Sequence, residues 1–178
     1  MRARITAIAI ATASIALTAV GSAAAADGSS AWDKFRERLS GYNEDPLALS
    51  TTGSGRFEAR IDDDNQEITY TLSYSELEGD VTQAHIHLGG RSQSGGVSVF
   101  LCSNLGNGPA GTQACPAAPA TITGTLRPTD VIGPTGQGIA PGQFDELVAA
   151  IRAGSTYVNV HSSQYPGGEI RAQLDHHH

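Results

Sequence analysis

The chain has 178 residues, with 18 Asp and Glu against 11 Lys and Arg, and a formal net charge of −7. This acidic balance, without any basic run, argues against nucleic acid or an anionic membrane surface as the main partner, because both reward clustered Lys and Arg. No stretch beyond the N-terminus approaches the ~20 apolar residues that a membrane-spanning helix needs, so no membrane span is predicted.

Residues 1–26 have the features of a secretory signal peptide. Arg2 and Arg4 precede an apolar run over residues 5–20, and small residues follow as far as Ala26. A charged, then apolar, then small-residue order is typical of a leader that is removed during export. We therefore expect cleavage after Ala26 and a secreted or periplasmic protein, whose remaining length suits one domain.

An N-terminal segment, residues 27–44, precedes the predicted domain. Its stretch AWDKFRERLSGY places Trp32, Phe35 and Leu39 at helical spacing, and a serine before it offers a cap. The spacing predicts a short, loosely docked helix.

From residue 55 onward the hydrophobic period changes to two. RFEARI and EITYTLSYSEL alternate on either side of the acidic turn DDDN at residues 62–65, which predicts a β-hairpin. Further strands are predicted for VTQAHIHLG, GGVSVFLC, ATITGTLRP, YVNVH and GEIRAQL, which are separated by Gly-, Pro- and Ser-rich turns.

One segment, APGQFDELVAAIRAGS, returns to helical spacing, and Gly154 ends it. Many short strands with one helix favour an all-β fold: an antiparallel Greek-key β-sandwich with one short crossover helix and a short N-terminal helix.

Cys102 and Cys115 are the two cysteines of the chain. Because export places thiols in an oxidising compartment, we expect a disulfide between them. A role as metal ligands is disfavoured, since the chain has no C-x-x-C pair.

Two histidines, His85 and His87, stand one residue apart in a predicted strand, and His161 ends another. Successive side chains of a strand point to opposite faces. The apolar residues of the first strand, such as Ile86, belong to the core face, so both histidines lie on the other face. By the same alternation, the side chain of His161 points to the face opposite that of its neighbour Val160. If the two strands are neighbours, the three imidazoles meet.

Residues i and i+2 of a strand are roughly 6.5 to 7 Å apart, which lets two imidazoles tilt onto one ion. Three imidazoles suit copper, and zinc less well. Such a pair is also found as two solvated residues on an exposed face, so the spacing alone leaves both interpretations open. The terminal histidines, residues 176–178, are set aside because they are either a tag remnant or a native tail.

VTQAHIHLGG, GGVSVFLC and YVNVHSSQYPGGEIRAQL together resemble the chordin (CHRD) domain, over residues 45–174. The resemblance implies an exported single-domain protein with a β-sandwich similar to that of Cu,Zn superoxide dismutase. In that dismutase an H-x-H pair and a later histidine bind copper, and His85, His87 and His161 are arranged similarly. The likeness covers only the copper half of that site. By its face, Arg171 is expected to guide an anion.

Two main functions stay open from the sequence, besides a third in which the polar face binds a carbohydrate or envelope component. The first is a copper-binding exported protein that stores or delivers copper or acts on superoxide; whether it is an enzyme is undecided. The alternative is a non-catalytic recognition or structural module whose polar sheet face binds a protein partner.

Overall fold

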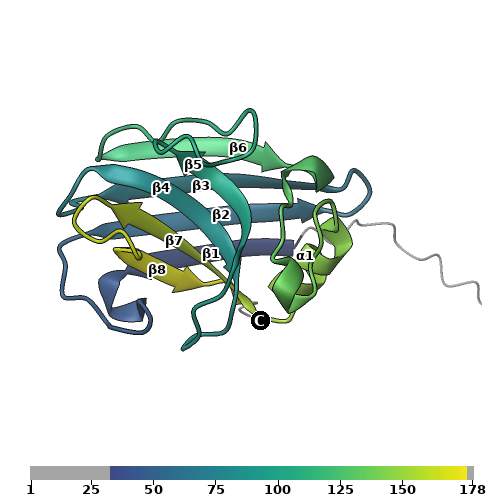
Figure 1. Ribbon diagram of the computed structural model, residues 1–178, viewed down its shortest axis with the longest axis horizontal. Helices are drawn as coiled ribbons and strands as arrows, with labels where there is room; N and C mark the ends of the chain where they lie inside the picture. Colours follow the sequence, from purple (N-terminus) through teal and green to yellow (C-terminus); the bar gives the residue numbers. More distant parts are fainter. Residues whose placement is uncertain (1–32, 176–178) are drawn as a thin grey trace, which may run out of the picture.

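The computed structural model describes residues 33–175, which form one eight-stranded sheet with one α-helix (Figure 1). The predicted signal peptide, Trp32 and the terminal histidines lie outside the described residues, so export stays a prediction. In the described part of the chain, no helix is long and apolar enough to cross a membrane.

All strand pairs are antiparallel, in the order β5-β4-β7-β8-β1-β2-β3-β6. Strands are present at each site where the sequence predicts one. The strands are β1 (Asp33–Ser40), β2 (Ser54–Asp62), β3 (Glu67–Ser75), β4 (Val81–Leu88), β5 (Val97–Ser103), β6 (Ala120–Leu126), β7 (Thr156–Ser162) and β8 (Ile170–Gln173). Three 3₁₀ turns, η1 (Gly41–Asn43), η2 (Pro128–Asp130) and η3 (Thr135–Gln137), and α1 (Phe144–Arg152) complete the described elements.

The sheet curls so that its two halves face each other. β8 and β1 are joined through one residue pair, Ser40 with Arg171, and in Figure 1 β4, β7 and β8 lie in front of β1, β2 and β3. The Tyr70 hydroxyl of β3 donates to the Leu101 carbonyl of β5 at 2.9 Å and so links the halves. The all-β antiparallel fold with one helix is confirmed, while the Greek-key connection and the dismutase likeness stay predictions.

Alternation in the predicted hairpin builds the core. Phe57 of β2 is paired with Leu72 of β3, and neither is exposed to solvent. The predicted helix is present as α1, whose apolar face, including Leu147 and Ile151, is buried. It covers one end of the two layers (Figure 1).

The predicted N-terminal helix is wrong, because residues 33–40 form strand β1. Phe35 and Leu39 are four residues apart, and this spacing also fits a period of two, in which both face the core. β1 pairs with β2 along its whole length, from Asp33 opposite Ile61 to Ser40 opposite Ser54. These ladder hydrogen bonds outweigh the helical preference that the spacing of Trp32, Phe35 and Leu39 had indicated.

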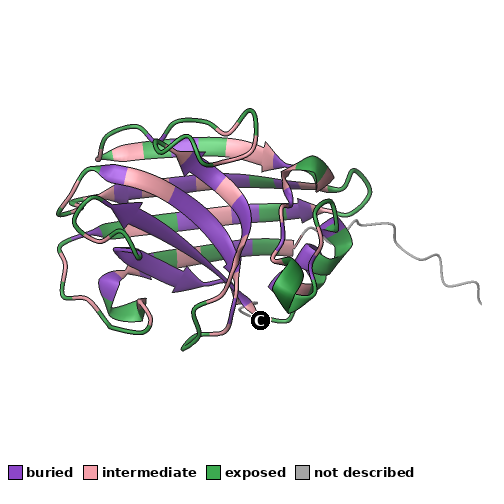
Figure 2. Ribbon diagram, viewed as in Figure 1, coloured by how far each residue is buried: buried purple, intermediate pink, exposed green. Residues whose placement is uncertain are grey.

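Burial differs between the two layers. Figure 2 shows alternating buried and exposed positions along β1, β2 and β3, but buried positions throughout β7 and β8. Every residue of β7 and of β8 is buried. Their second face, on which the sequence places His161 and Arg171, is therefore covered as well.

The predicted disulfide between Cys102 and Cys115 is present, and both residues are buried. It ties the end of β5 to the loop that leads to β6. The loop is rich in Gly and Pro, so its unfolded form has many conformations for the crosslink to restrict.

Replacing both cysteines, Cys102→Ser/Cys115→Ser, is expected to lower the free energy of unfolding by roughly 2–4 kcal/mol, because the open loop regains conformational entropy when the chain unfolds. Urea denaturation measures the loss. Wild-type protein under reducing conditions serves as the matched control and should lose a similar amount. Equal midpoints for oxidised, reduced and substituted protein would contradict this role.

Candidate metal centre

The three strand histidines meet on the face of β4 and β7 that points away from the core. β4 and β7 are neighbours, with His87 opposite Tyr157 and His85 opposite Asn159. His161 lies two residues further along β7, diagonally across from His85. The predicted alternation holds, since Ile86 and Val160 belong to the core on the other side.

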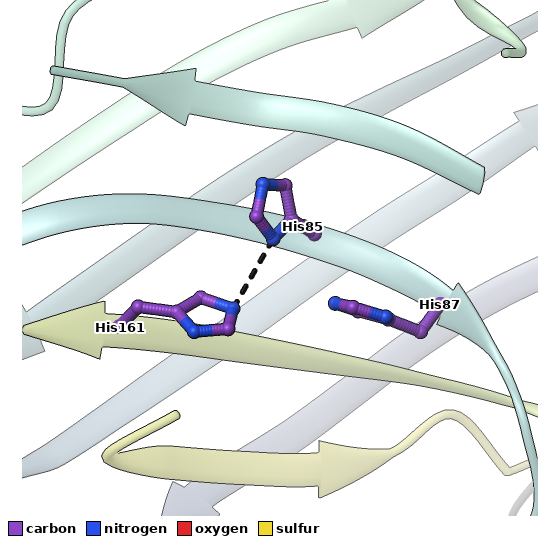
Figure 3. A group of neighbouring side chains, drawn as sticks. All are labelled: His85, His87 and His161. Carbon is purple, nitrogen blue, oxygen red and sulfur yellow. Dashed lines mark hydrogen bonds between the residues drawn. The ribbon is translucent and has the colours of Figure 1, made fainter. Parts of the chain in front are cut away.

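Figure 3 shows the three rings converging from the two strands. Nδ1 of His85 lies 3.2 Å from Nε2 of His161, and one nitrogen of His87 points toward the gap beside them. One ligand atom from each ring can be chosen so that all three lie within 4.8 Å of one another.

The histidines are not solvated, contrary to the exposed outer face that the sequence suggested. His85, His87 and His161 are 2%, 7% and 5% exposed. Segments 41–52, 89–96 and 163–168, here called the three covering loops, contact these strands: Gly95 and Pro166 meet His87 and His161, and Asn43 donates to a β8 carbonyl. The burial removes the interpretation as solvated surface residues, and it also argues against the alternative in which this polar face binds a protein partner.

Arg171 holds one covering loop in place. Its guanidinium donates to the carbonyls of Gly90 and Gln93 at 2.7 and 3.0 Å, and it lies 3.4 Å from the centre of the Tyr157 ring. Tyr157 stacks in turn on His87, with ring centres 4.7 Å apart. The predicted anion guide is thus buried beside the histidine cluster, separated from His87 by an aromatic ring.

Backbone carbonyls fix the orientation of two imidazoles. Nδ1 of His87 donates to the Gly95 carbonyl at 2.9 Å, and Nδ1 of His161 donates to the Pro166 carbonyl at 3.0 Å. A carbonyl can only accept, so the proton of each neutral ring resides on Nδ1 and the lone pair on Nε2. Nε2 of His87 and Nε2 of His85 have no hydrogen-bond partner among the described residues.

Burial keeps these rings neutral. It lowers the pKa of His85 from 6.5 to about 2, helped by the neighbouring His161 and His87. It lowers the pKa of His161 to about 4, against an opposing effect of the Pro166 carbonyl. Burial also lowers the pKa of His87, and the positive Arg171 contributes in the same direction. Neutral imidazole is the form that binds metals.

Glu44 is a buried acid that the sequence analysis missed. Burial raises its pKa from 4.5 to about 7, although Arg171 pulls in the other direction. Its Oε1 has no hydrogen-bond partner within the described part of the chain. Glu44 follows the short turn η1 and carries no motif, so only the folding of loop 41–52 onto β7 identifies it.

The structure gives a reason for the second glycine of the pair Gly167–Gly168 in the stretch SQYPGGEIR. The φ of Gly168 is +132°, and a Cβ there would lie 2.7 Å from Oε1 of Glu44 and 2.8 Å from Nδ2 of Asn159. A side chain at this position would therefore be strained and would push the Glu44 carboxyl and Asn159 away from the histidines. Gly167 is different, since a Cβ there meets nothing within 4 Å.

The residues present fit a bound metal ion. Two nitrogens that each lie about 2.0–2.1 Å from one ion can be no more than about 4.2 Å apart. The His85 to His161 separation of 3.2 Å satisfies this limit, and the 4.8 Å spread of the three atoms requires a shift of less than about 1 Å. Oδ1 of Asn159, 3.1 Å from Nε2 of His161, adds another acceptor. Converging acceptors are satisfied by a cation better than by one shared proton.

Comparison with known proteins gives one match. The family model of the CHRD domain matches residues 35–174. The match starts within β1, in agreement with the place of that strand in the sheet. Neither the curated proteins nor the solved structures contain a match.

The substitution Gly168→Ala is expected to lower the free energy of unfolding by roughly 1–3 kcal/mol, because it places a Cβ at positive φ and against Glu44. Gly167→Ala is the matched control and should change stability by less than about 0.5 kcal/mol. Urea denaturation of the two variants makes the comparison. Equal effects of both substitutions would contradict the close packing assigned to Gly168.

Metal-free protein is expected to lose stability as the pH falls from about 6.5 toward 4. The histidine pKa values are lowered by folding, so in this range the unfolded chain binds protons that the folded chain does not. Glu44 has the opposite effect on stability between pH 4.5 and 7, because its pKa is raised by folding. The effect of the three imidazoles is expected to outweigh that of this one carboxyl.

Denaturation at several pH values measures this slope. In a His85→Ala/His87→Ala variant the slope should become flatter, because one imidazole then remains to oppose Glu44. An unchanged slope in that variant would contradict the assignment of neutral, buried rings.

Proposed function

The chain belongs to the CHRD domain family, and we propose that it binds one copper ion through His85, His87 and His161. One observation carries this proposal: three buried imidazoles converge, and backbone carbonyls orient two of them, His87 and His161, so that each presents an unprotonated Nε2. Metal-binding histidines characteristically donate their other ring N–H to a carbonyl or carboxylate, which fixes the tautomer. A purely structural histidine has no need to leave a buried Nε2 such as that of His87 without a partner.

Copper is favoured by the ligand set. Three imidazoles without a thiolate or a direct carboxylate suit copper or zinc, and at equal access Cu²⁺ binds nitrogen ligands more tightly than Zn²⁺. The two cysteines are engaged in the disulfide and are therefore not available as ligands. Zinc remains the second choice.

The protein's own residues would prepare this site in three ways. Gly95 and Pro166 orient two rings, Arg171 keeps loop 89–96 closed over them, and burial excludes solvent. With its pKa raised to about 7, the Glu44 carboxyl exists in both its protonated and its ionised form near neutral pH in the metal-free protein, and the added charge of a cation would favour the carboxylate.

Bound copper would supply a redox centre, since imidazole tolerates both Cu(II) and Cu(I). Storage or delivery of copper and reaction with superoxide are both compatible with this chemistry. The positive Arg171 beside the cluster supports anion guidance, but its two hydrogen bonds to loop 89–96 mean that the loop must open before an anion reaches the guanidinium.

Copper titration tests the proposal in protein whose three terminal histidines are replaced by serine. Wild type in this background is expected to bind one Cu²⁺ per chain tightly, and both His85→Ala/His87→Ala and His161→Ala should weaken binding by at least about 100-fold, because each loses direct ligands. Calorimetric titration gives the affinity and the stoichiometry.

Ser98→Ala is the matched control. Ser98 is a fully buried polar residue of the adjacent strand β5, so its removal changes buried polarity without removing a metal ligand. It should leave copper binding unchanged. The melting temperature is measured with and without copper. A rise for wild type but not for the still-folded histidine variants shows that these variants have lost the site and not the fold. Equal binding by wild type and both histidine variants would refute the proposal.

A further inference from the structure

The second layer of the fold turns a polar face toward solvent. This face, here called the basic face, consists of the outward side chains of β1, β2, β3 and β6. They stand at even positions 34–40 and 54–60 and at odd positions 69–75 and 121–125. Because side chains alternate along a strand, the residues between them belong to the core or its margin. The basic face lies on the strands of one layer and the histidine cluster on β4 and β7 of the other, and the edge position Ser40 of the face is paired with Arg171 of β8.

Positive charge is concentrated on the basic face although the chain as a whole is acidic. Of the 11 Lys and Arg residues, two lie in the predicted signal peptide and five lie here: Lys34, Arg36, Arg38, Arg56 and Arg60. Glu58 is the one acid among the face positions defined above, and Asp62 of β2 and Glu67 of β3 follow in the same alternation at one end of the face. The chain therefore has a local cationic strip on this face, although its net charge is −7.

The strand register sets like charges opposite one another. Arg38 is paired with Arg56, and Lys34 is paired with Arg60. Directly opposed like charges destabilise an antiparallel pair. Between them, Arg36 approaches Glu58 at 3.9 Å, but both side chains are exposed, so this ion pair contributes little. An anion lying across β1 and β2 beside Arg38 and Arg56 would relieve the repulsion of that pair.

Hydroxyl groups continue the basic face across β3 and β6. Thr69 is opposite Thr125 and Thr71 is opposite Thr123, with serine and threonine next in register. The side chains of this face therefore offer cationic donors on two strands and neutral hydroxyls, which both donate and accept, on the other two. That combination matches a ligand with both anionic groups and hydroxyls.

The basic face is hollowed along its length. One depression of about 670 Å³ is lined by Arg38 and Arg56 together with several serines. A second, of about 310 Å³, is lined by Lys34, Arg36 and Arg60 together with threonines. Six residue steps along β1 span about 20 Å, so the two depressions together suit an extended polymer rather than a single small ion.

We propose that the basic face binds a linear anionic polysaccharide, one that carries carboxylate or sulfate groups at regular intervals. Cations and hydroxyls on the face match the anionic groups and hydroxyls of such a chain. The face positions hold no aromatic or large apolar side chain, and the aromatic residues that line the depressions, Phe35, Tyr70 and Tyr74, are buried. A protein interface uses exposed anchors of this kind, single-stranded nucleic acid stacks on them, and a membrane-surface helix inserts them.

Binding of defined oligosaccharides tests this inference with the purified protein at neutral pH. The probes are heparin fragments for sulfate, alginate fragments for carboxylate, and uncharged dextran of similar length. Fluorescence anisotropy gives each affinity at low and high salt. Wild type should bind at least one anionic probe but not dextran, and binding should weaken as salt screens the charges. Whichever anionic probe binds more tightly identifies the group that the face prefers.

The variant Arg38→Ser/Arg56→Ser should weaken binding by about tenfold or more, because it removes two charge-assisted contacts. The control Arg91→Ser/Arg152→Ser changes the net charge by the same amount at other positions; these arginines pair with Asp175, Asp33 and Asp63, whose side chains are 23%, 21% and 59% exposed. It should keep the wild-type affinity. Circular dichroism of both variants confirms that they are folded.

Equal losses in the two double variants would overturn the proposal, since they would show attraction by net charge alone. Binding of dextran as tight as that of the anionic probes would also overturn it. So would binding of DNA, an acidic peptide or anionic lipid vesicles by a protein that binds neither anionic oligosaccharide. Because the substituted arginines and the three histidines are on different strands, failure here leaves the copper proposal untouched, and the reverse also holds.

Discussion

Burial of β7 and β8 on both faces is the constraint on which the candidate site depends. One face of these strands carries apolar residues such as Val158 and Val160 and joins the core, as in any two-layer sheet. The other face carries His161, Asn159 and Arg171, which are polar but nevertheless buried. Buried polar groups need partners. The backbone of the covering loops provides them, so the loops and the polar face fix each other.

The same constraint gives the histidines their chemical state. An imidazole on an exposed strand would share its proton with water and titrate near 6.5. Beneath the covering loops it loses the solvation that supports a charge, and the pKa of each of the three rings falls. Carbonyls of Gly95 and Pro166 then decide which nitrogen keeps the proton. Neutral rings with inward lone pairs result from the burial of the face as much as from the residue types.

The two layers use one pattern of alternation for different purposes. In β1 and β2 the polar positions face water, so their charges remain solvated and five cations gather on one surface. In β4 and β7 the polar positions face protein, so charge is excluded and neutral ligands gather instead. The difference is the loop cover. Polar positions without it form a surface suited to polyanions, and polar positions beneath it form a pocket suited to a metal ion.

The sequence by itself determined the strands, the helix α1, the disulfide and the face on which the histidines lie, because each depends on local periodicity or on residue chemistry. Strand β1 was the exception: Phe35 and Leu39 fit two periods equally, and only pairing with β2 decides between them. The tertiary structure alone decided that β4 and β7 are neighbours, that three loops bury the histidines, and that Glu44 and Gly168 lie beside them. Those contacts join segments far apart along the chain, and no local pattern records which loop covers which face.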